Sequence, residues 1–197
     1  MGDKGSATRE RILEVALQLF QYKGFGGTTI SDILASAGIK KGTLYFHFTS
    51  KDEIGFSVLQ RAGSELSAFL DSVLVGDTAL AKLDSYFSGI LEWQRSLKFV
   101  GGCIFGNAAL EMSDSNELYA DYIGQVFEQW IETIRSIVVA AQESGDIRED
   151  VPAEGLARQI VASTEGAIML ARLHKHEHSL NLCFTSLRQM LAPVQTP

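Results

Sequence analysis

The stretch that most constrains the fold of this chain covers residues 29–53. Thr29 and Asp32 stand three residues apart, which is the spacing of a capping pair that satisfies exposed amide groups at the start of a helix. Gly38 follows this helix and allows the positive φ of a tight turn. A second short helix is predicted for residues 40–46, and a further helix begins directly after it. The stretch therefore predicts two short helices joined by a tight turn, with a third following at once.

Apolar residues recur at helical spacing over the rest of the chain, and no convincing alternating run indicates a strand. Prolines are few, and glycines mark most of the breaks between helical stretches. The sequence therefore predicts an all-α fold of about nine helices, with ranges 7–23, 29–36, 40–46, 50–74, 78–97, 103–112, 115–144, 153–174 and 180–191. Helix caps are expected from Ser50 with Glu53, from Asp114 with Glu117, and from Ser179.

Two short helices with a tight turn are the arrangement of a helix-turn-helix, whose second helix enters the major groove of DNA while the first crosses the backbone. At the start of the second helix, lysines contact phosphate or guanine edges, and threonine contacts bases or a thymine methyl. Hydroxyl, imidazole and ammonium groups beside it contact phosphate, as do groups at neighbouring helix starts. The predicted DNA-contacting residues are Thr28, Thr29, Lys40, Lys41, Gly42, Thr43, Tyr45, His47 and Lys51.

Side chains late in the second helix have two alternative environments, the core or the DNA. Leu44 is assigned to the core as the inward anchor, with an aromatic contribution from Tyr45, Phe46 or Phe48. Tyr45 is assigned to phosphate, because the surrounding constellation favours that contact. His47 stays open between the two environments.

The charge of the chain is unevenly distributed. Its net charge of −7 argues at first against a nucleic-acid partner. Residues 1–52, however, carry seven basic and five acidic side chains, whereas the remainder carries ten basic and nineteen acidic ones. We therefore expect the basic end to face phosphate while the acidic body keeps the protein soluble.

A group of residues within 11–53 carries a family resemblance. They are Ala16, Leu17, Leu19, Phe20, Gly24, Phe25, Thr28, Thr29, Ile30, Ile33, Ala37, Gly38, Lys41, Gly42, Thr43, Leu44, Tyr45, His47, Phe48, Ser50, Lys51, Asp52 and Glu53. In this combination the stretch, about a quarter of the chain, resembles the DNA-binding domain of the TetR family of bacterial transcriptional regulators. One departure is Lys40, which stands where the family often has a Ser or Thr helix cap and which cannot cap in that way.

The resemblance implies that residues 1–52 form the DNA-binding domain and residues 53–197 a helical effector-binding and dimerisation domain. The helices predicted at 153–174 and 180–191 support this independently, because both are apolar on a broad face and the first carries small residues that permit close packing. Two such helices from each subunit make a four-helix homodimer interface. A palindromic double-stranded operator requires two readers about 34 Å apart.

An effector pocket is expected among the aromatic residues of the longer helices, with a few polar anchors. Cys103, Asn107 and Glu111 lie four residues apart and share a helix face. The motif resembles a Gly-Cys…Asn…Glu pattern in a branch of the same family, in which some members sense electrophiles or oxidants through the cysteine. A buried thiol, a non-covalent pocket residue and a reactive sensor all stay open. The candidate pocket residues are Phe69, Phe87, Trp93, Cys103, Phe105, Asn107, Glu111, Tyr122, Phe127, Trp130, Glu165 and Met169.

The predicted function is a sequence-specific DNA-binding transcriptional regulator, preferably a repressor released from its operator by a small-molecule effector. The alternatives are a thiol-based sensor through Cys103 and a regulator without a ligand. We find no glycine-rich phosphate loop, nucleophile motif or metal-ligand cluster, so neither an enzyme nor a cofactor is expected.

Other partners are not indicated by the sequence. His174, His176 and His178 alternate, but no Cys or carboxylate pattern completes a standard zinc site. No apolar run reaches the roughly 18 residues of a membrane span. The chain has two cysteines, too few for a disulfide framework, so a cytoplasmic location is expected.

Overall fold

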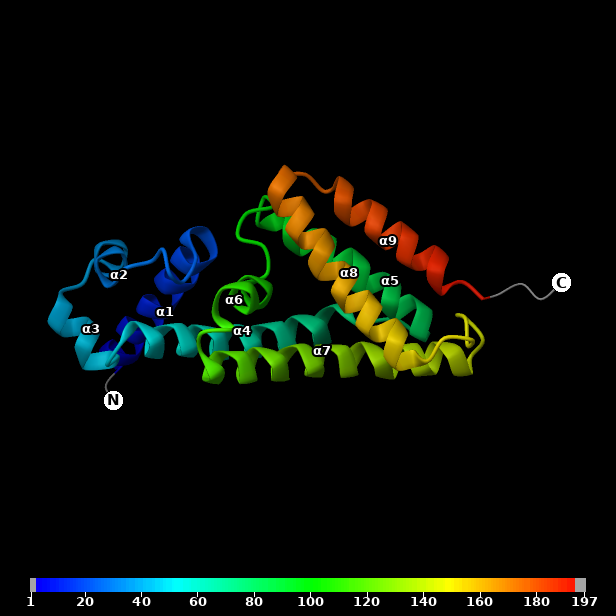
Figure 1. The fold of residues 1–197 in the computed structure, drawn as a ribbon, viewed down its shortest axis with the longest axis horizontal. Coiled ribbons are helices and arrows are strands. Elements are labelled where there is room, and N and C mark those ends of the chain that lie inside the picture. Colours follow the sequence, from blue (N-terminus) through cyan, green and yellow to red (C-terminus); the bar gives the residue numbers. More distant parts are fainter. Residues whose placement is uncertain (1–2, 194–197) are drawn as a thin grey trace. The chain divides into compact units, whose positions relative to one another are not determined.

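A computed structural model describes residues 3–193, and the ends of both predicted domains (1–2 and 194–197) lie outside that range. The described part is built from nine α-helices and contains no strand, which confirms the all-α prediction. The helices are α1 (Asp3–Lys23), α2 (Ile30–Ala37), α3 (Lys41–His47), α4 (Lys51–Val73), α5 (Ala79–Ser96), α6 (Ile104–Met112), α7 (Glu117–Glu143), α8 (Ala153–His174) and α9 (His178–Leu191) (Figure 1). Within that range, no helix is long and apolar enough to cross a membrane.

The chain divides into two compact units, and the division differs from the predicted boundary after residue 52. The first unit extends to Glu65 and also includes Cys103–Ile123, which contains α6. The second includes Leu66–Gly102 and continues from Gly124, so α4 and α7 contribute residues to both. The physical reason for the grouping is that Ile104 of α6 packs against the core formed by α1 to α4.

The core of the first unit is apolar and fully enclosed. It consists of Ile12, Leu13, Ala16, Phe20, Ile33, Leu44, Phe48, Ile54 and Val58. Burying one large aliphatic or aromatic side chain contributes about 1.5–3 kcal/mol. Because α2 and α3 are too short to be stable alone, this shared core with α1 and α4 is what holds them in place (Figure 1).

The predicted capping of α2 is confirmed in full. The amide of Asp32 donates to the Thr29 hydroxyl (3.1 Å), and the amide of Thr29 donates to the Asp32 carboxylate (2.8 Å). Gly38 ends the helix at φ 62°, the left-handed conformation that a side chain would disfavour. These local interactions fix where the helix-turn-helix bends.

The other predicted caps need correction. Ser50 accepts from the amide of Glu53 (3.0 Å), but the Glu53 carboxylate reaches back to the amide of Thr49 (2.6 Å) rather than that of Ser50. Asn116, not Asp114, caps α7 by accepting from the amide of Tyr119 (3.3 Å). The cap predicted for Ser179 is wrong, because α9 already begins at His178 and has no side-chain cap.

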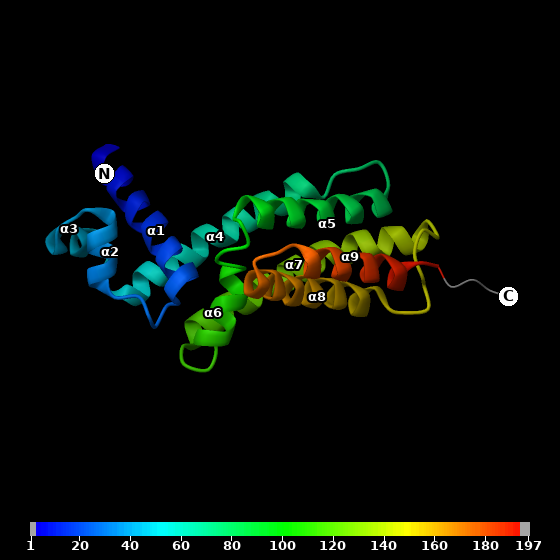
Figure 2. The ribbon, with the colours of Figure 1, turned by 90° about the horizontal axis from the view of Figure 1, so that it is seen from above.

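In the second unit, α8 and α9 pack side by side, and α9 also contacts α5 (Figure 2). The rings of Phe87 (α5) and Phe184 (α9) stack at 4.9 Å between centroids. Tyr86 of α5 donates its buried hydroxyl to Thr164 of α8 (3.2 Å). Several large apolar side chains of α8 and α9 nevertheless stay exposed, namely Met169, Leu170, Leu173, Leu182 and Met190.

Candidate DNA-reading surface and effector region

The two faces of α3 have opposite environments. Leu44 is fully buried and Phe48, just after the helix, is 1% exposed, so these two side chains anchor α3 to the core. Lys40, Lys41 and Thr43 are exposed at its start, as is Gly42. Lys40 makes no side-chain cap, as the sequence indicated. The beginning of α3 therefore presents two cations, a hydroxyl and an unobstructed backbone to solvent.

The end of α3 exposes aromatic side chains, and this exposure agrees only in part with the sequence prediction. Tyr45 is 44% exposed, and the ammonium of Lys41 lies 5.8 Å from its ring centroid. Phe46 is 73% exposed and meets His47 edge-on at 5.1 Å, so it is not a core aromatic. The Nδ1 atom of His47 is buried and finds no hydrogen-bond acceptor or donor among the described residues.

The structure places the threonines at the start of α2 differently from each other. Thr28 is 1% exposed, and its hydroxyl donates to the carbonyl of Gly24 (2.7 Å). Thr29 is exposed, although its hydroxyl is engaged in the cap with Asp32. The side chain of Thr28 is therefore part of the turn rather than of the exposed surface.

Lys51 lies at the first position of α4 and points back at the turn between α1 and α2. Its ammonium donates to the carbonyls of Phe25 (2.9 Å) and Thr28 (3.1 Å) and lies 4.3 Å from the Phe25 ring centroid. The sequence predicted a phosphate contact here, but spacing alone does not reveal that two of the three ammonium hydrogens are used within the protein.

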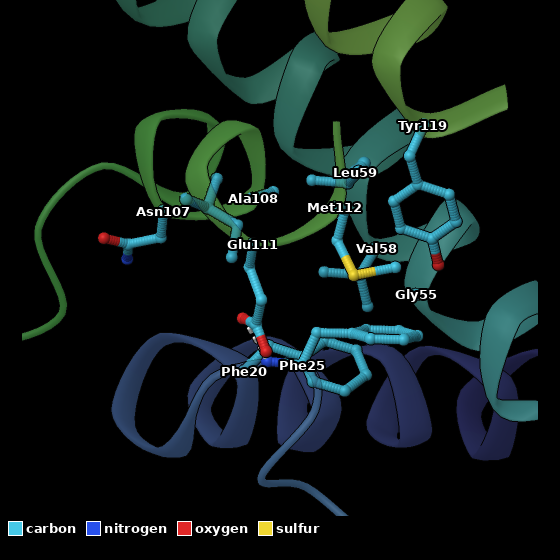
Figure 3. Close-up of a pocket in the computed structure, with 11 residues that line it drawn as sticks. Phe20, Phe25, Gly55, Val58, Leu59, Asn107, Ala108, Glu111, Met112 and Tyr119 are labelled. Carbon is cyan, nitrogen blue, oxygen red and sulfur yellow. Dashed lines mark hydrogen bonds between the residues drawn. The ribbon is translucent and has the colours of Figure 1, made fainter. Parts of the chain in front are cut away.

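The candidate effector residues are divided between the two units. In the first unit, Cys103 is 6% exposed at the start of α6, and Phe105 is 2% exposed. Glu111, in contrast, is an exposed side chain whose carboxylate accepts from the amide of Phe25 (2.8 Å; Figure 3). The same carboxylate also accepts from the amide of Gly26 (2.5 Å). In the same view, the amide of Asn107 points away from the rings of Phe20 and Phe25.

Tyr122, also in the first unit, packs edge-on against Phe56 at 5.4 Å. In the second unit, the rings of Phe69 and Trp93 lie 5.4 Å apart, and Phe127 stacks on Trp130 at 6.1 Å. The remaining candidates there are Phe87 (1% exposed, on α5), Glu165 (partly buried, on α8) and Met169, which is 56% exposed on α8.

Gln94 on α5 is a candidate effector residue that the sequence prediction does not include. Its side chain is 0% exposed, and neither its amide nitrogen nor its amide oxygen bonds any group in the described part of the chain. The indole N–H of Trp130 is likewise buried without an acceptor there. A signal existed in the sequence, because Gln94 follows Ile90 and Phe87 by four and seven residues and so interrupts an apolar stripe with an amide.

Family models match both parts of the chain. Residues 12–57 match the model described as "Bacterial regulatory proteins, tetR family", and residues 79–187 match "Tetracyclin repressor-like, C-terminal domain". The chain belongs to the TetR family of DNA-binding transcriptional regulators. Within this TetR-family chain, α2, α3 and the part of α1 from residue 12 onward lie in the region of the first model, whereas α6 lies in that of the second.

Two individual proteins match this chain over nearly its whole length, and a third matches it over a shorter region. The "HTH-type transcriptional repressor DhaR" of Mycobacterium sp. (strain GP1) is 30% identical over 187 residues, covering 94% of this chain and 92% of that protein. A TetR regulator from Chloroflexus aurantiacus has a crystal structure with a TM-score of 0.87 and 33% identity, covering 95% and 96% of the two chains. The "Biofilm operon icaADBC HTH-type negative transcriptional regulator IcaR" of Staphylococcus aureus (strain Newman) is 48% identical over 46 residues, or 23% of this chain and 25% of that protein.

Proposed function

We propose that this TetR-family protein is a repressor that binds a palindromic operator as a homodimer and is released by a small-molecule effector. The observation that carries the DNA-binding part is α3, which is anchored by Leu44 while Lys40, Lys41 and Thr43 face solvent. Lysine and threonine at the start of a reading helix match the chemistry of guanine edges, thymine methyls and phosphates. Repression is supported by DhaR and IcaR, which are both named as negative regulators.

The contact assignment is tested on DNA selected from a random pool by the full-length protein. Tyr45→Ala is expected to weaken binding to all sequences to a similar extent, because a phosphate contact carries no sequence information. Thr43→Ala is expected to change the preferred bases as well. Tyr22→Ala is the control, because Tyr22 is a 75% exposed tyrosine on α1 outside the proposed surface. If Tyr45→Ala binds DNA as tightly as the parent does, Tyr45 does not contact the DNA.

The homodimer is supported by the exposed apolar side chains of α8 and α9. Leu173 and Leu182 are 70% and 56% exposed, although single-chain packing would be expected to cover residues of this kind on two long helices. Small residues of α8, including Gly166 and Ala162, let a second helix approach closely. Two helices from each subunit then form a four-helix interface, and two readers match a palindrome.

The effector is supported by buried polar groups of the second unit that have no hydrogen-bond partner among the described residues. Leaving a buried donor or acceptor without a partner costs about 1–3 kcal/mol, and Gln94 and Trp130 carry such groups. A small molecule with both hydrogen-bond donors and acceptors would satisfy them among aromatic side chains. Its binding would shift α4 and change the separation of the two α3 helices, which releases an operator of fixed half-site spacing.

A second mode of release, by chemical reaction of the Cys103 thiol, has weaker support than release by a non-covalent effector. A reactive sensor needs an accessible thiolate, whereas Cys103 is 6% exposed and occupies the residue before α6. Treatment with a thiol-reactive electrophile separates the two modes. If release of the operator depends on small-molecule binding, Cys103→Ser will still respond to the effector. If release depends on the thiol, this variant will stay on DNA in the presence of the electrophile.

A further inference from the structure

The turn between α1 and α2 is held by two side chains of opposite charge. The carboxylate of Glu111 on α6 accepts from the backbone amide of Phe25 (2.8 Å; Figure 3) and from that of Gly26 (2.5 Å). The ammonium of Lys51 on α4 donates to the carbonyls of Phe25 (2.9 Å) and Thr28 (3.1 Å). The carboxylate therefore binds amide donors of the turn, and the ammonium binds carbonyl acceptors of the turn. At the end of a helix, such backbone groups are otherwise left to bond with solvent.

Aromatic packing seals the inner side of this turn. The ring of Phe25 lies 5.2 Å from that of Phe20 and 5.6 Å from that of Tyr119. Tyr119 donates its hydroxyl to the carbonyl of Asp52 (2.8 Å). Burial, with a smaller effect of the Asp52 carboxylate, raises the pKa of Tyr119. The remaining cavity of about 20 Å³ has room for roughly one water.

The turn matters because it leads directly into the reading motif. Thr28 follows it as a buried residue, Thr29 caps α2, and α2 shares its core with α3. Glu111 belongs by sequence to the region 79–187 that matches the C-terminal family domain, yet its carboxylate is bonded to the backbone of the DNA-binding region. A residue of the sequence region 79–187 thus stabilises the turn that leads into α2 and α3.

We propose that Glu111 is a positioning residue for DNA binding, which acts by fixing the turn between α1 and α2 through the amides of Phe25 and Gly26. It contacts no DNA itself, and the role exists without any effector. The proposal therefore goes beyond the proposed function, and it makes α6 a second element, besides α4, that positions α3.

Glu111→Gln tests the proposal through the sign of its effect. Removing a negative charge from a DNA-binding protein should by electrostatics alone strengthen binding to the phosphate backbone. Positioning predicts the opposite, because glutamine keeps one acceptor but turns an NH2 group toward the other amide. The loss of one charge-assisted hydrogen bond corresponds to a decrease in affinity of about tenfold. The matched control is Asp114→Asn, which makes the same charge change at an exposed site three residues further on.

Two further measurements separate positioning from a general loss of structure. Amide hydrogen exchange at Phe25 and Gly26 should become faster in Glu111→Gln and stay unchanged in Asp114→Asn. Gly26→Ala offers an independent route, because its Cβ would lie 3.0 Å from a Glu111 carboxylate oxygen and push that oxygen away from the turn by a few tenths of an ångström. This change should lower DNA affinity in the parent but cause no further loss in a Glu111→Ala background.

The DNA used is a duplex selected by the parent protein, at one fixed salt concentration. The proposal is overturned if Glu111→Gln binds this duplex as tightly as, or more tightly than, the parent. It is also overturned if exchange at Phe25 and Gly26 is unchanged, or if Gly26→Ala weakens binding equally in both backgrounds. Failure of the parent to select any duplex would instead contradict the proposed function, so the two failures are distinguishable.

Discussion

At the scale of single residues, the ammonium of Lys51 has two alternative roles in DNA binding, a contact with phosphate and support of the turn between α1 and α2. The sequence predicts a phosphate contact, whereas two ammonium hydrogens bond the carbonyls of Phe25 and Thr28. A lost phosphate contact lowers the slope of log affinity against log salt by about 0.9, and a lost positioning contact does not. We expect Lys51→Met to reduce affinity about tenfold with an unchanged slope. Lys40→Met, at the exposed residue just before α3, should lower this salt slope. If the slope falls equally in Lys51→Met and Lys40→Met, Lys51 also contacts phosphate.

Gln94 gives a second prediction at this scale, for stability without DNA. Replacing an orphaned buried amide by an apolar side chain of similar size removes a penalty of about 1–3 kcal/mol. We expect Gln94→Leu to raise the thermal midpoint, at roughly 2–4 °C per kcal/mol for a chain of this size. Thr164→Val is the matched control and should lower it, because Thr164 accepts a buried hydrogen bond from Tyr86. A lower midpoint for Gln94→Leu would mean that its amide is satisfied in the free protein.

At the scale of elements, the cap of α2 makes the motif sensitive to acid. Hydrogen bonds from Lys23 and then from Thr29 hold the pKa of Asp32 well below its usual range. The stabilisation is therefore complete above the pKa of Asp32 in the unfolded chain, about 4, and is lost as the pH falls below that value. We expect the thermal midpoint of the parent to exceed that of Asp32→Asn at neutral pH, with a difference that shrinks below about pH 4. High salt should reduce the difference, because the pair with Lys23 is partly exposed.

The elements themselves were largely predictable, and their long-range partners were not. Helix periodicity, the Thr29–Asp32 spacing and Gly38 locate α1 to α3 because each signal is local. For α7 the sequence predicts a cap at Asp114, whereas Asn116 provides it, because several polar residues in one short segment can each act as a cap. The partner of Glu111 lies 86 residues away at Phe25, and no helical periodicity encodes a contact of that separation.

At the scale of the whole molecule, an operator with two half-sites requires two copies of α3, so dimerisation and DNA affinity should fail together. Leu173→Glu places a charge in the proposed α8–α9 interface. We expect this variant to be a monomer where the parent is a dimer, as measured by analytical sedimentation. Binding to a palindromic duplex should fall by more than about a hundredfold, because two tethered readers gain roughly that much from avidity. Leu110→Glu is the matched control, since Leu110 is a more exposed leucine (88%, against 70% for Leu173) and lies on α6. A Leu173→Glu protein that stays dimeric would move the interface away from this face of α8.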